Sequence, residues 1–249
     1  MKRVLVTGSQ GFMGRHLVQR LQGRGDLTVL EFERTDSPAA LGEMARRADL
    51  VYHLAGVNRP LDEGDFDRVN RGLTLALIRA VEAAPRRIPI VFSSSIQAVL
   101  KNPYGISKRR AERALIRYGL RHRVPVYLFR LPNTFGGGAR PDYNSVVATF
   151  CYRIAHDQPI RIDDPHRTLR LVYIDDVVAA FEKLVDGPPA AGNRFYYAVD
   201  PVFAIGLAEL AELLRQFKNS LPELTDPSRP ADALRRHLAE TYRYYQSLP

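Results

Sequence analysis

A tyrosine and a lysine, Tyr104 and Lys108, stand four residues apart, and their side chains suit proton transfer. On a helix, such positions lie one above the other on the same face. Asn102 is a good N-cap and Pro103 suits a first helical turn, so we expect a helix to begin here. A nearby ammonium favours ionisation of a phenol, whose ordinary pKa is about 10. The pair therefore predicts a proton donor or acceptor.

A glycine-rich loop follows the short apolar run Val4 to Val6, which is typical of a buried strand. An amphipathic helix is expected directly after the loop. Gly8 suits a tight turn, Gly11 a close approach of backbone to phosphate, and Gly14 close packing of helix on strand. The spacing is one residue longer than in the usual dinucleotide fingerprint. Strand, loop and helix together predict a pyrophosphate site at a helix N-terminus.

Strand and helix signals alternate along the chain without internal repeats. Strands are expected near 2–7, 27–33, 49–54, 88–94 and 124–131. Helices are expected near 12–23, 38–47, 65–84, 103–120 and 144–157. This order predicts an α/β fold, a Rossmann-type doubly wound parallel sheet with helices on both faces.

The later part of the chain is less regular, and it predicts a small C-terminal α/β lobe. Residues 1–249 are expected to form one domain, about 1–158 being the sheet core and about 159–249 the lobe. Segment 159–219 offers short strands and two helices. Segment 227–249 predicts an amphipathic helix. One face of that helix carries Leu234, Leu238, Tyr242 and Tyr245.

Ligands of such sheets bind at the carboxyl ends of the strands. The segments expected to cluster there are Thr7, Glu31 to Arg34, His53 to Gly56, Ser93 to Ser95 and Leu131 to Thr134.

Composition limits the classes of function. The chain has 249 residues, is 45% hydrophobic and carries a formal net charge of +9. Its one cysteine, Cys151, rules out an internal disulfide, and no residues have metal-ligand spacing. No apolar stretch is long enough for a signal peptide or a membrane span, which favours a cytoplasmic enzyme. The charge suggests an anionic partner; the arginines are scattered among acids, unlike a nucleic-acid-binding surface, and a phosphate-bearing cofactor and substrate explain the charge as well.

The glycine loop, Leu54-Ala55-Gly56, Ser93-Ser94-Ser95 and Tyr104-x-x-x-Lys108 occur in this order. Together they resemble the extended short-chain dehydrogenase/reductase family, which acts on nucleotide sugars. The resemblance implies a Rossmann core that binds NAD(P) and a smaller lobe that binds the sugar nucleotide. It implies Ser95 as the catalytic hydroxyl, Tyr104 as the proton donor or acceptor and Lys108 as its partner, although Ser93 or Ser94 could take the place of Ser95.

The resemblance also implies the residues that contact the cofactor. These are Gly8, Gln10, Gly11, Phe12, Met13, Gly14, Arg34, Leu54, Ala55, Gly56 and Lys108. Asn70 matches the family's helix asparagine, with a mainly structural role.

Cofactor choice depends on the end of the second strand. A carboxylate there suits the ribose of NAD, whereas an arginine suits the 2′-phosphate of NADP. Glu31 and Glu33 fall on one face of the strand and Arg34 on the other. Only one of these sets can therefore contact the ribose of the cofactor. We favour NADP(H) over NAD(H), with Arg34, supported by Thr35, as the phosphate ligand.

The reaction can be narrowed within the family. Relatives that dehydrate sugars have an Asp-Glu pair after the catalytic hydroxyl, and this chain has Ile96-Gln97. Dehydration is therefore disfavoured, whereas an NAD-dependent epimerase stays open. The strings Ala55 to Pro60, Ser94 to Ala98 and Leu131 to Gly136 resemble the reductase domain of capsule and O-antigen enzymes on the route to UDP-N-acetyl-L-fucosamine.

That resemblance implies reduction by NADPH of the 4-keto group of a UDP-2-acetamido-2,6-dideoxy-4-hexulose. In that group a C-terminal cupin domain first epimerises the sugar, and this chain ends at Pro249, about where the cupin would begin. Either the cupin has been removed, or a separate protein supplies the epimerised ketone, or the substrate differs. The family also commonly forms homodimers through the helix that starts at Pro103, where Leu115 and Ile116 either face the partner or pack on the sheet.

Three residues are predicted to bind the substrate. Asn133 matches the family's diphosphate-contacting asparagine, and Asn144 stands at the start of a helix, where it is equally well explained as an N-cap. Leu169 takes the place of a pyrophosphate-binding arginine of many relatives, so Arg59 or another arginine must compensate. Two other classes stay open: a non-catalytic NADP-binding regulator, which would ordinarily lack the Tyr/Lys pair, and an RNA-binding protein, which rests on charge alone.

Overall fold

The computed structural model describes residues 1–60, 62–187, 195–221 and 230–249. The chain divides into two compact units. The first comprises Met1–Leu131 and Val178–Ala198, and the second Pro132–Val177 and Val199–Pro249. The expected boundary near residue 158 therefore falls inside the second unit. The chain leaves the first unit directly after its fifth strand and returns to it later, a route that local sequence signals do not reveal.

The first unit contains a six-stranded parallel sheet in the order β2-β1-β3-β4-β5-β8. Its strands are β1 (Lys2–Thr7), β2 (Leu27–Phe32), β3 (Leu50–His53), β4 (Ile90–Ser95), β5 (Val126–Leu131) and β8 (Tyr196–Tyr197). The strand order reverses at β1, since β2 lies on one side of it and β3 on the other. In doubly wound sheets this switch point is where ligands bind. The predicted doubly wound parallel sheet is confirmed.

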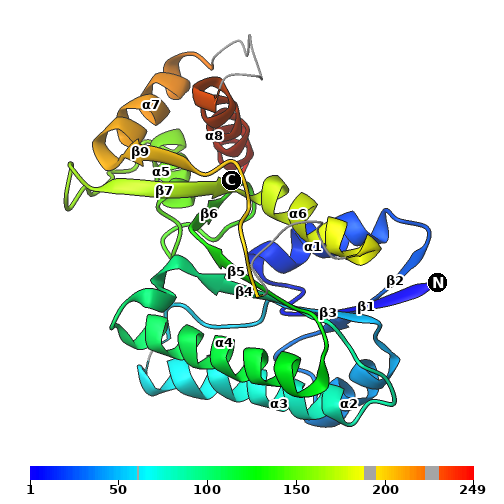
Figure 1. Cartoon of the computed structure of the whole chain (residues 1–249). Coiled ribbons are helices and arrows are strands. Elements are labelled where there is room, and N and C mark those ends of the chain that lie inside the picture. The colour runs from blue at the N-terminus through cyan, green and yellow to red at the C-terminus, as the bar shows by residue number, and fades with distance from the viewer. Residues whose placement is uncertain (61, 188–194, 222–229) are drawn as a thin grey trace. The chain divides into compact units, whose positions relative to one another are not determined.

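Helices cover both faces of this sheet (Figure 1). They are α1 (Phe12–Gln22), α2 (Pro38–Arg47), α3 (Gly72–Glu82), α4 (Pro103–His122) and α6 (Ile174–Asp186), with a π-helical turn η1 (Phe66–Arg71) before α3 and a 3₁₀ turn η2 (Ile96–Val99) after β4. Helices α2, α3 and α4 lie on one face, and α1 and the part of α6 in this unit lie on the other. Leu5, Val51 and Phe92 are among the strand residues buried beneath α2, α3 and α4. Leu115 of α4 is fully buried in the same core, so it packs on the sheet rather than facing outward.

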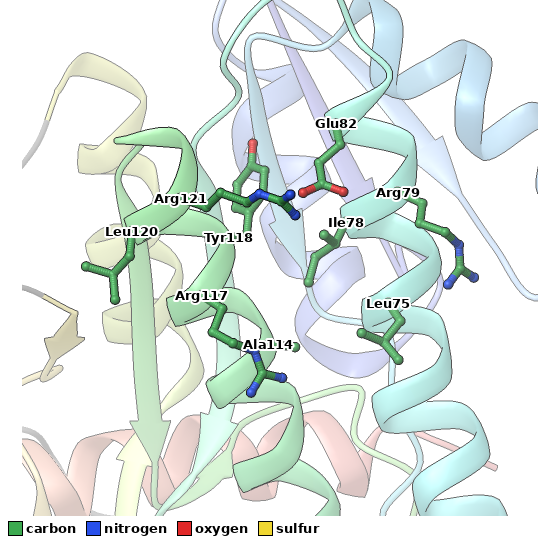
Figure 2. Close-up of a pocket in the computed structure, with 9 residues that line it drawn as sticks. All are labelled: Leu75, Ile78, Arg79, Glu82, Ala114, Arg117, Tyr118, Leu120 and Arg121. Carbon is green, nitrogen blue, oxygen red and sulfur yellow. The ribbon is translucent and has the colours of Figure 1, made fainter.

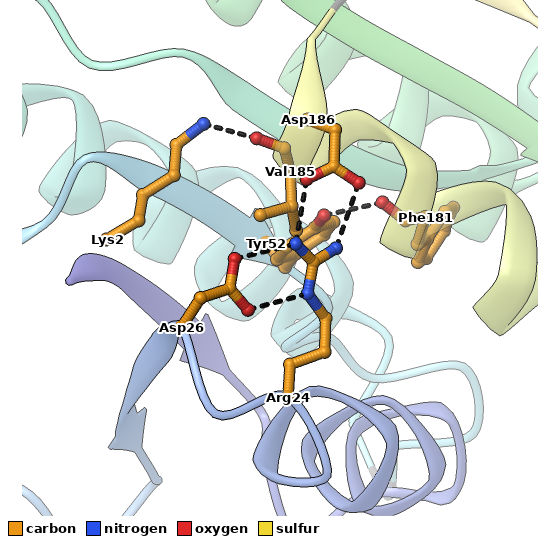
Figure 3. Close-up of polar contacts among 7 residues, drawn as sticks. All are labelled: Lys2, Arg24, Asp26, Tyr52, Phe181, Val185 and Asp186. Atoms are coloured by element: carbon orange, nitrogen blue, oxygen red, sulfur yellow. Dashed lines mark hydrogen bonds and ion pairs between the residues drawn. The ribbon is translucent and has the colours of Figure 1, made fainter.

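Polar contacts hold the C-terminal end of α6 against residues in and next to β1, β2 and β3 (Figure 3). Arg24 pairs with both Asp26 and Asp186, with N–O distances of 2.8 Å. Lys2 donates to the carbonyl oxygen of Val185, and the Tyr52 hydroxyl donates to a carbonyl of α6. Lys2 and Asp26 lie at the amino ends of β1 and β2, so the contacts of Lys2 and Arg24 stabilise the fold at the end opposite to the glycine loop.

Within the described residues, the second unit contains a three-stranded sheet in the order β6-β7-β9 and three helices of its own. Its elements are β6 (Asn133–Phe135), α5 (Val146–Ala155), β7 (Thr168–Tyr173), β9 (Phe203–Gly206), α7 (Leu207–Asn219) and α8 (Pro230–Gln246). On α8, Leu238, Tyr242 and Tyr245 are fully buried and Leu234 nearly so, which confirms the predicted apolar face. Residues 227–229 of the predicted helix lie outside the described residues. The small α/β lobe is thus confirmed, with an earlier start than expected.

Local capping explains where several helices begin. Ser37 caps α2, Asn102 caps α4 through a 2.7 Å hydrogen bond from the Gly105 amide, and Ser145 caps α5. Asn144 is therefore not the N-cap of α5, because Ser145 accepts the hydrogen bond from the Ala148 amide instead. None of the helices in the described ranges is both long and apolar enough to cross a membrane.

Candidate active site

The glycine loop joins β1 to α1 at the switch in strand order. Gly8 has a φ of +72°, and a Cβ there would lie 2.8 Å from the backbone nitrogen of Ala55. A Cβ on Gly14 would lie 2.0 Å from the carbonyl oxygen of Gly8. Gly11 is the N-cap of α1, and none of the described side chains accepts from the first amides of the helix. The loop therefore closes tightly against the segment that follows β3 and presents free helix amides, a cradle that fits a pyrophosphate.

The other predicted cofactor residues flank this cradle. Gln10 is exposed at the tip of the loop, and Phe12 and Met13 are half-buried in the first turn of α1. Leu54, Ala55 and Gly56 follow β3, and the Ala55 amide donates weakly to the Thr7 hydroxyl over 3.4 Å. The structure therefore brings the ends of β1 and β3 together.

Asn70 connects this strand end to the helix that carries Tyr104. Its amide group exchanges two hydrogen bonds with the backbone of Val57, at 2.8 and 2.9 Å, and donates to the Ser107 hydroxyl over 3.0 Å. A Cβ on Gly56 would lie 2.8 Å from Asn70 Oδ1 and 3.3 Å from Lys108 Nζ. The buried Asn70 side chain thus links the segment after β3 to α4, which agrees with the structural role that the resemblance implied.

Ser95, Tyr104 and Lys108 meet where β4 and α4 approach each other. The Ser95 and Tyr104 side chains are hydrogen-bonded to each other. Lys108 Nζ donates to the carbonyl oxygen of Ser93 over 2.9 Å and lies 4.8 Å from the centroid of the Phe92 ring. Gly105 allows this approach, because a Cβ there would lie 2.1 Å from the carbonyl oxygen of Gln97.

The three neighbouring serines have different surroundings. Ser93 and Ser94 are buried, and their hydroxyls donate to the carbonyl of His53 and to the Glu112 carboxylate. Ser95 is half-buried, contacts Tyr104, and also accepts from the Gln97 amide at 3.1 Å, which caps η2. Of the three hydroxyls, that of Ser95 is the one beside Tyr104.

Burial controls the electrostatics of the pair. It raises the pKa of Tyr104, an effect that the hydrogen bond with Ser95 opposes. It lowers the pKa of Lys108 to about 8, and the negative charge of Glu112 works against that decrease. Tyr104 therefore holds its proton at neutral pH, beside an ammonium whose charge is easily lost.

Opposing charges meet at the end of β2. The Glu33 carboxylate accepts from the Ser9 hydroxyl at 3.0 Å and from the Gln10 amide. Glu31 accepts from Gln10 and from Gln22, at 3.3 and 3.4 Å. Arg34 is exposed, and none of the described residues pairs with it. Both carboxylates therefore already accept hydrogen bonds from protein donors, whereas Arg34 pairs with none of the described residues.

The predicted substrate residues are divided between the two units. Arg59 is exposed in the loop after β3 of the first unit. Asn133 and Asn144 belong to the second unit and are both exposed there. Asn133 Nδ2 donates to the carbonyl oxygen of Arg170 over 3.1 Å. Leu169 is buried in the second unit, so it packs rather than binds.

A cavity of about 660 Å³ lies elsewhere, between α3 and α4 (Figure 2). It is lined by Leu75, Ile78, Arg79, Glu82, Ala114, Arg117, Tyr118, Leu120 and Arg121. No residue predicted for catalysis or cofactor binding is among them. Across the described ranges, His, Cys, Asp and Glu form no cluster able to hold a metal ion.

Sequence reasoning gave no role to two buried groups of the site. His53 is fully buried, and its ring nitrogens lie 2.8 Å from the Thr7 hydroxyl and 2.9 Å from the Thr74 hydroxyl. Burial lowers its pKa to about 3, so the ring is neutral. Glu112, also buried, stands four residues after Lys108. That helical spacing was a signal that could have revealed it.

Comparison with known proteins places the chain in one family. The chain belongs to the NAD dependent epimerase/dehydratase family, whose model matches residues 4–196. This confirms the resemblance inferred from the motifs.

One curated relative matches almost the whole chain and has a stated activity. The chain is 47% identical over 240 residues to a UDP-2-acetamido-2,6-beta-L-arabino-hexul-4-ose reductase of Pseudomonas aeruginosa. The match covers 96% of this chain and 64% of that protein, so the chain spans less than two thirds of the relative.

Solved structures agree on the fold. The capsular polysaccharide assembling protein CapF of Staphylococcus aureus superposes with a TM-score of 0.84 at 33% identity, over 99% of this chain and 67% of that one. RMD of Pseudomonas aeruginosa, solved with NADPH, superposes with a TM-score of 0.83 at 22% identity over the full length of both chains. The second likeness is one of fold alone.

Proposed function

We propose that this chain reduces the 4-keto group of a nucleotide-linked 6-deoxy-hexulose, with NADPH as the reductant. The UDP-2-acetamido-2,6-dideoxy-4-hexulose type of substrate is favoured. The observation that carries the proposal is the contact of Ser95 with Tyr104, one helical turn before the buried Lys108. The 47% identity to a reductase that acts on such a ketone supports the substrate class.

The proposed roles follow from the chemistry of ketone reduction. A bound NADPH supplies the hydride to the carbonyl carbon. Negative charge then develops on the ketone oxygen, and the Ser95 hydroxyl donates a hydrogen bond to it. Tyr104, which holds its proton at neutral pH, transfers that proton to the oxygen. Lys108 stabilises the tyrosinate that is left, because an ammonium one helical turn away favours the charged phenol.

The chain's own residues fit the cofactor. The glycine loop and the free first amides of α1 would hold the pyrophosphate, with Gln10, Phe12 and Met13 beside it. We assign the 2′-phosphate to Arg34, which is unpaired within the described residues, whereas Glu31 and Glu33 are engaged by glutamine and loop donors. These contacts support NADP(H) over NAD(H).

The test is to supply purified protein with NADPH and candidate UDP-4-keto-6-deoxy sugars and to follow the absorbance of the reduced nicotinamide. We expect stoichiometric oxidation of NADPH that is lost in Tyr104→Phe. The matched control is Tyr118→Phe, which removes one hydroxyl from the same helix at a site where it bonds the carbonyl of Ile88. It should keep the activity.

Other outcomes would assign the chain differently. Interconversion of two sugars without net cofactor consumption would make it an epimerase. Tight NADPH binding with no turnover on any keto sugar would make it a regulator. Equal activity of Tyr104→Phe and wild type would remove Tyr104 from the mechanism.

The proposal includes two partners. One is a second copy of the chain, which would dock on the outer surface of α3 and α4, where Leu120 is exposed beside the cavity of Figure 2. The other is a separate epimerase that supplies the ketone. Light scattering of wild type and Leu120→Glu tests the first partner: a dimer that dissociates in the variant supports it, and a wild-type monomer contradicts it.

A further inference from the structure

Three positions of α4 contact three consecutive serines of β4. Tyr104 bonds to the Ser95 side chain, Lys108 Nζ donates to the Ser93 carbonyl over 2.9 Å, and Glu112 accepts from the Ser94 hydroxyl at 2.5 Å. Residues spaced by four lie on one face of a helix. Glu112 therefore continues the row that begins with the proton-transfer pair.

Glu112 is a buried carboxylate with an unusually full set of donors. Its exposed fraction is 1%, and besides Ser94 it accepts from Arg130 through two nitrogens, at 2.9 and 2.6 Å, and from the Tyr196 hydroxyl at 3.3 Å. A bidentate arginine and two hydroxyls supply the hydrogen bonds that a buried carboxylate requires. The Arg130 side chain, in contrast, is 31% exposed, so water screens its charge more strongly.

Lys108 has few groups that can stabilise its charge. β4 offers the Ser93 carbonyl and the Phe92 ring, and β3 offers His53, which is neutral because burial lowers its pKa. Glu112 of its own helix is the acidic group whose charge acts on Lys108. An ammonium removed from water in this way loses its proton readily unless a negative charge compensates.

We propose that Glu112 is a positioning residue of the active site, whose buried carboxylate holds Lys108 in its charged form and in place beneath Tyr104. Glu112 touches neither the substrate nor the cofactor in this role, and acts through Lys108. The reaction it would serve is the proposed ketone reduction, on which this role rests. Ser94 and Arg130 contribute by fixing the carboxylate.

The direct test is an NMR titration of Lys108 with ¹³Cε-labelled lysine. The sequence has five lysines, at positions 2, 101, 108, 183 and 218, so the signals are few. Lys108→Arg assigns the signal of interest. We expect Glu112→Gln to lower the titration midpoint of Lys108 by about one pH unit, since a buried charge one helical turn away is removed. The control Glu82→Gln removes a carboxylate that pairs with His122 near the other end of α4, and should leave Lys108 unchanged.

Glu112→Gln removes the carboxylate that pairs with Arg130, so a second variant is needed in case the first does not fold. The double variant Glu112→Gln/Arg130→Gln removes both charges of the pair, and we expect a smaller decrease of the Lys108 midpoint in the same direction. A folded variant, single or double, in which Lys108 titrates as in wild type overturns the proposal. The proposal is also overturned if Glu82→Gln shifts the titration midpoint of Lys108 as much as Glu112→Gln does.

Kinetics give a second measurement that a purely structural role would not affect. The alkaline limb of the kcat profile should move to lower pH in Glu112→Gln by the amount seen in the titration, whereas Glu112→Asp should keep the wild-type limb. A uniform loss of kcat at all pH values, with no movement of the limb, would contradict the proposal. If wild type reduces no keto sugar and Lys108 still responds to Glu112→Gln, the proposed reaction fails while the coupling between the two residues is supported.

Discussion

Replacing Gly8 by alanine should destabilise the chain and abolish cofactor binding. Two independent features of the loop oppose a Cβ at this position. The backbone has a φ of +72°, which L-residues with a side chain rarely adopt. The new atom would also lie 2.8 Å from both the Cα and the nitrogen of Ala55, which are backbone atoms that cannot rotate away.

The magnitude follows from the two contributions. A left-handed alanine costs about 1–2 kcal/mol, and forced displacement of packed atoms costs roughly 1–3 kcal/mol. The smaller conformational freedom of alanine in the unfolded chain returns about 0.5 kcal/mol. The free energy of unfolding should therefore fall by roughly 1.5–4.5 kcal/mol, which for a chain of this length is a decrease in Tm of roughly 3–18 °C.

Three other glycines separate the contributions. Gly14 tests collision, since its Cβ would lie 2.0 Å from the Gly8 carbonyl oxygen. Gly187 tests backbone strain alone, with a φ of +145° and no described atom within 4 Å of an added Cβ, and its change to alanine should lower Tm by about 1–6 °C. Gly25 has neither feature, so Gly25→Ala should be close to neutral.

The assay is thermal unfolding by circular dichroism, combined with NADPH binding followed by nucleotide fluorescence. Gly8→Ala and Gly14→Ala should lose NADPH binding even where they are folded, because the loop must move to accommodate the new atom. Gly187→Ala should bind as wild type does. A Gly8→Ala protein with wild-type Tm and wild-type NADPH affinity would refute the reasoning.

Three further predictions concern charge. Arg34→Ala should weaken NADPH binding much more than NADH binding, and equal losses by calorimetry would contradict a 2′-phosphate contact. Arg24 holds the pKa of Asp26 and of Asp186 below the ordinary value of 3.8, so its stabilising effect is present at neutral pH and disappears as the pH falls through the lowered pKa values. The Tm difference between wild type and Arg24→Ala should accordingly be present at pH 7 and absent in strong acid, and a constant difference would count against the ion pairs. Because burial lowers the pKa of His53 from 6.5 to about 3, the unfolded chain binds one proton more between these pH values, and stability should fall by up to about 1.4 kcal/mol per pH unit as the pH decreases. Urea unfolding at pH 7 and pH 5 should show that His53→Gln loses this part of the pH dependence, and an unchanged dependence would contradict the buried neutral ring.

Sequence patterns predicted the regular part of the fold well. The five expected strands begin and end within two residues of β1 to β5, because buried parallel strands are continuous apolar runs between polar turns. The Tyr/Lys helix was equally clear, since Asn102 and Pro103 mark its start. The π-helical turn at Phe66–Arg71 was not predicted, because its residues fit an α-helix pattern as well.

The less predictable features depend on contacts between residues far apart in the sequence. Tyr196–Tyr197 pairs with β5, although a large part of the second unit separates them in the chain. Two residues cannot signal a strand by periodicity, so only tertiary pairing identifies them. In the site, Ser95 could be separated from its neighbours only once Ser93 and Ser94 were seen to be buried.

The reactivity of the Tyr/Lys pair depends on residues outside the four-residue motif. Because Lys108 is buried, water does not sustain its charge, and the neighbouring side chains decide whether it is an ammonium at neutral pH. Glu112 favours the charged form, whereas a cationic His53 would oppose it. His53 is kept neutral by burial between two threonine hydroxyls, one of which is Thr7 at the end of β1. The strand that leads into the glycine loop therefore also helps to set the charge of Lys108 beneath Tyr104. A substitution of Thr7 should affect both the glycine loop and the pKa of Lys108.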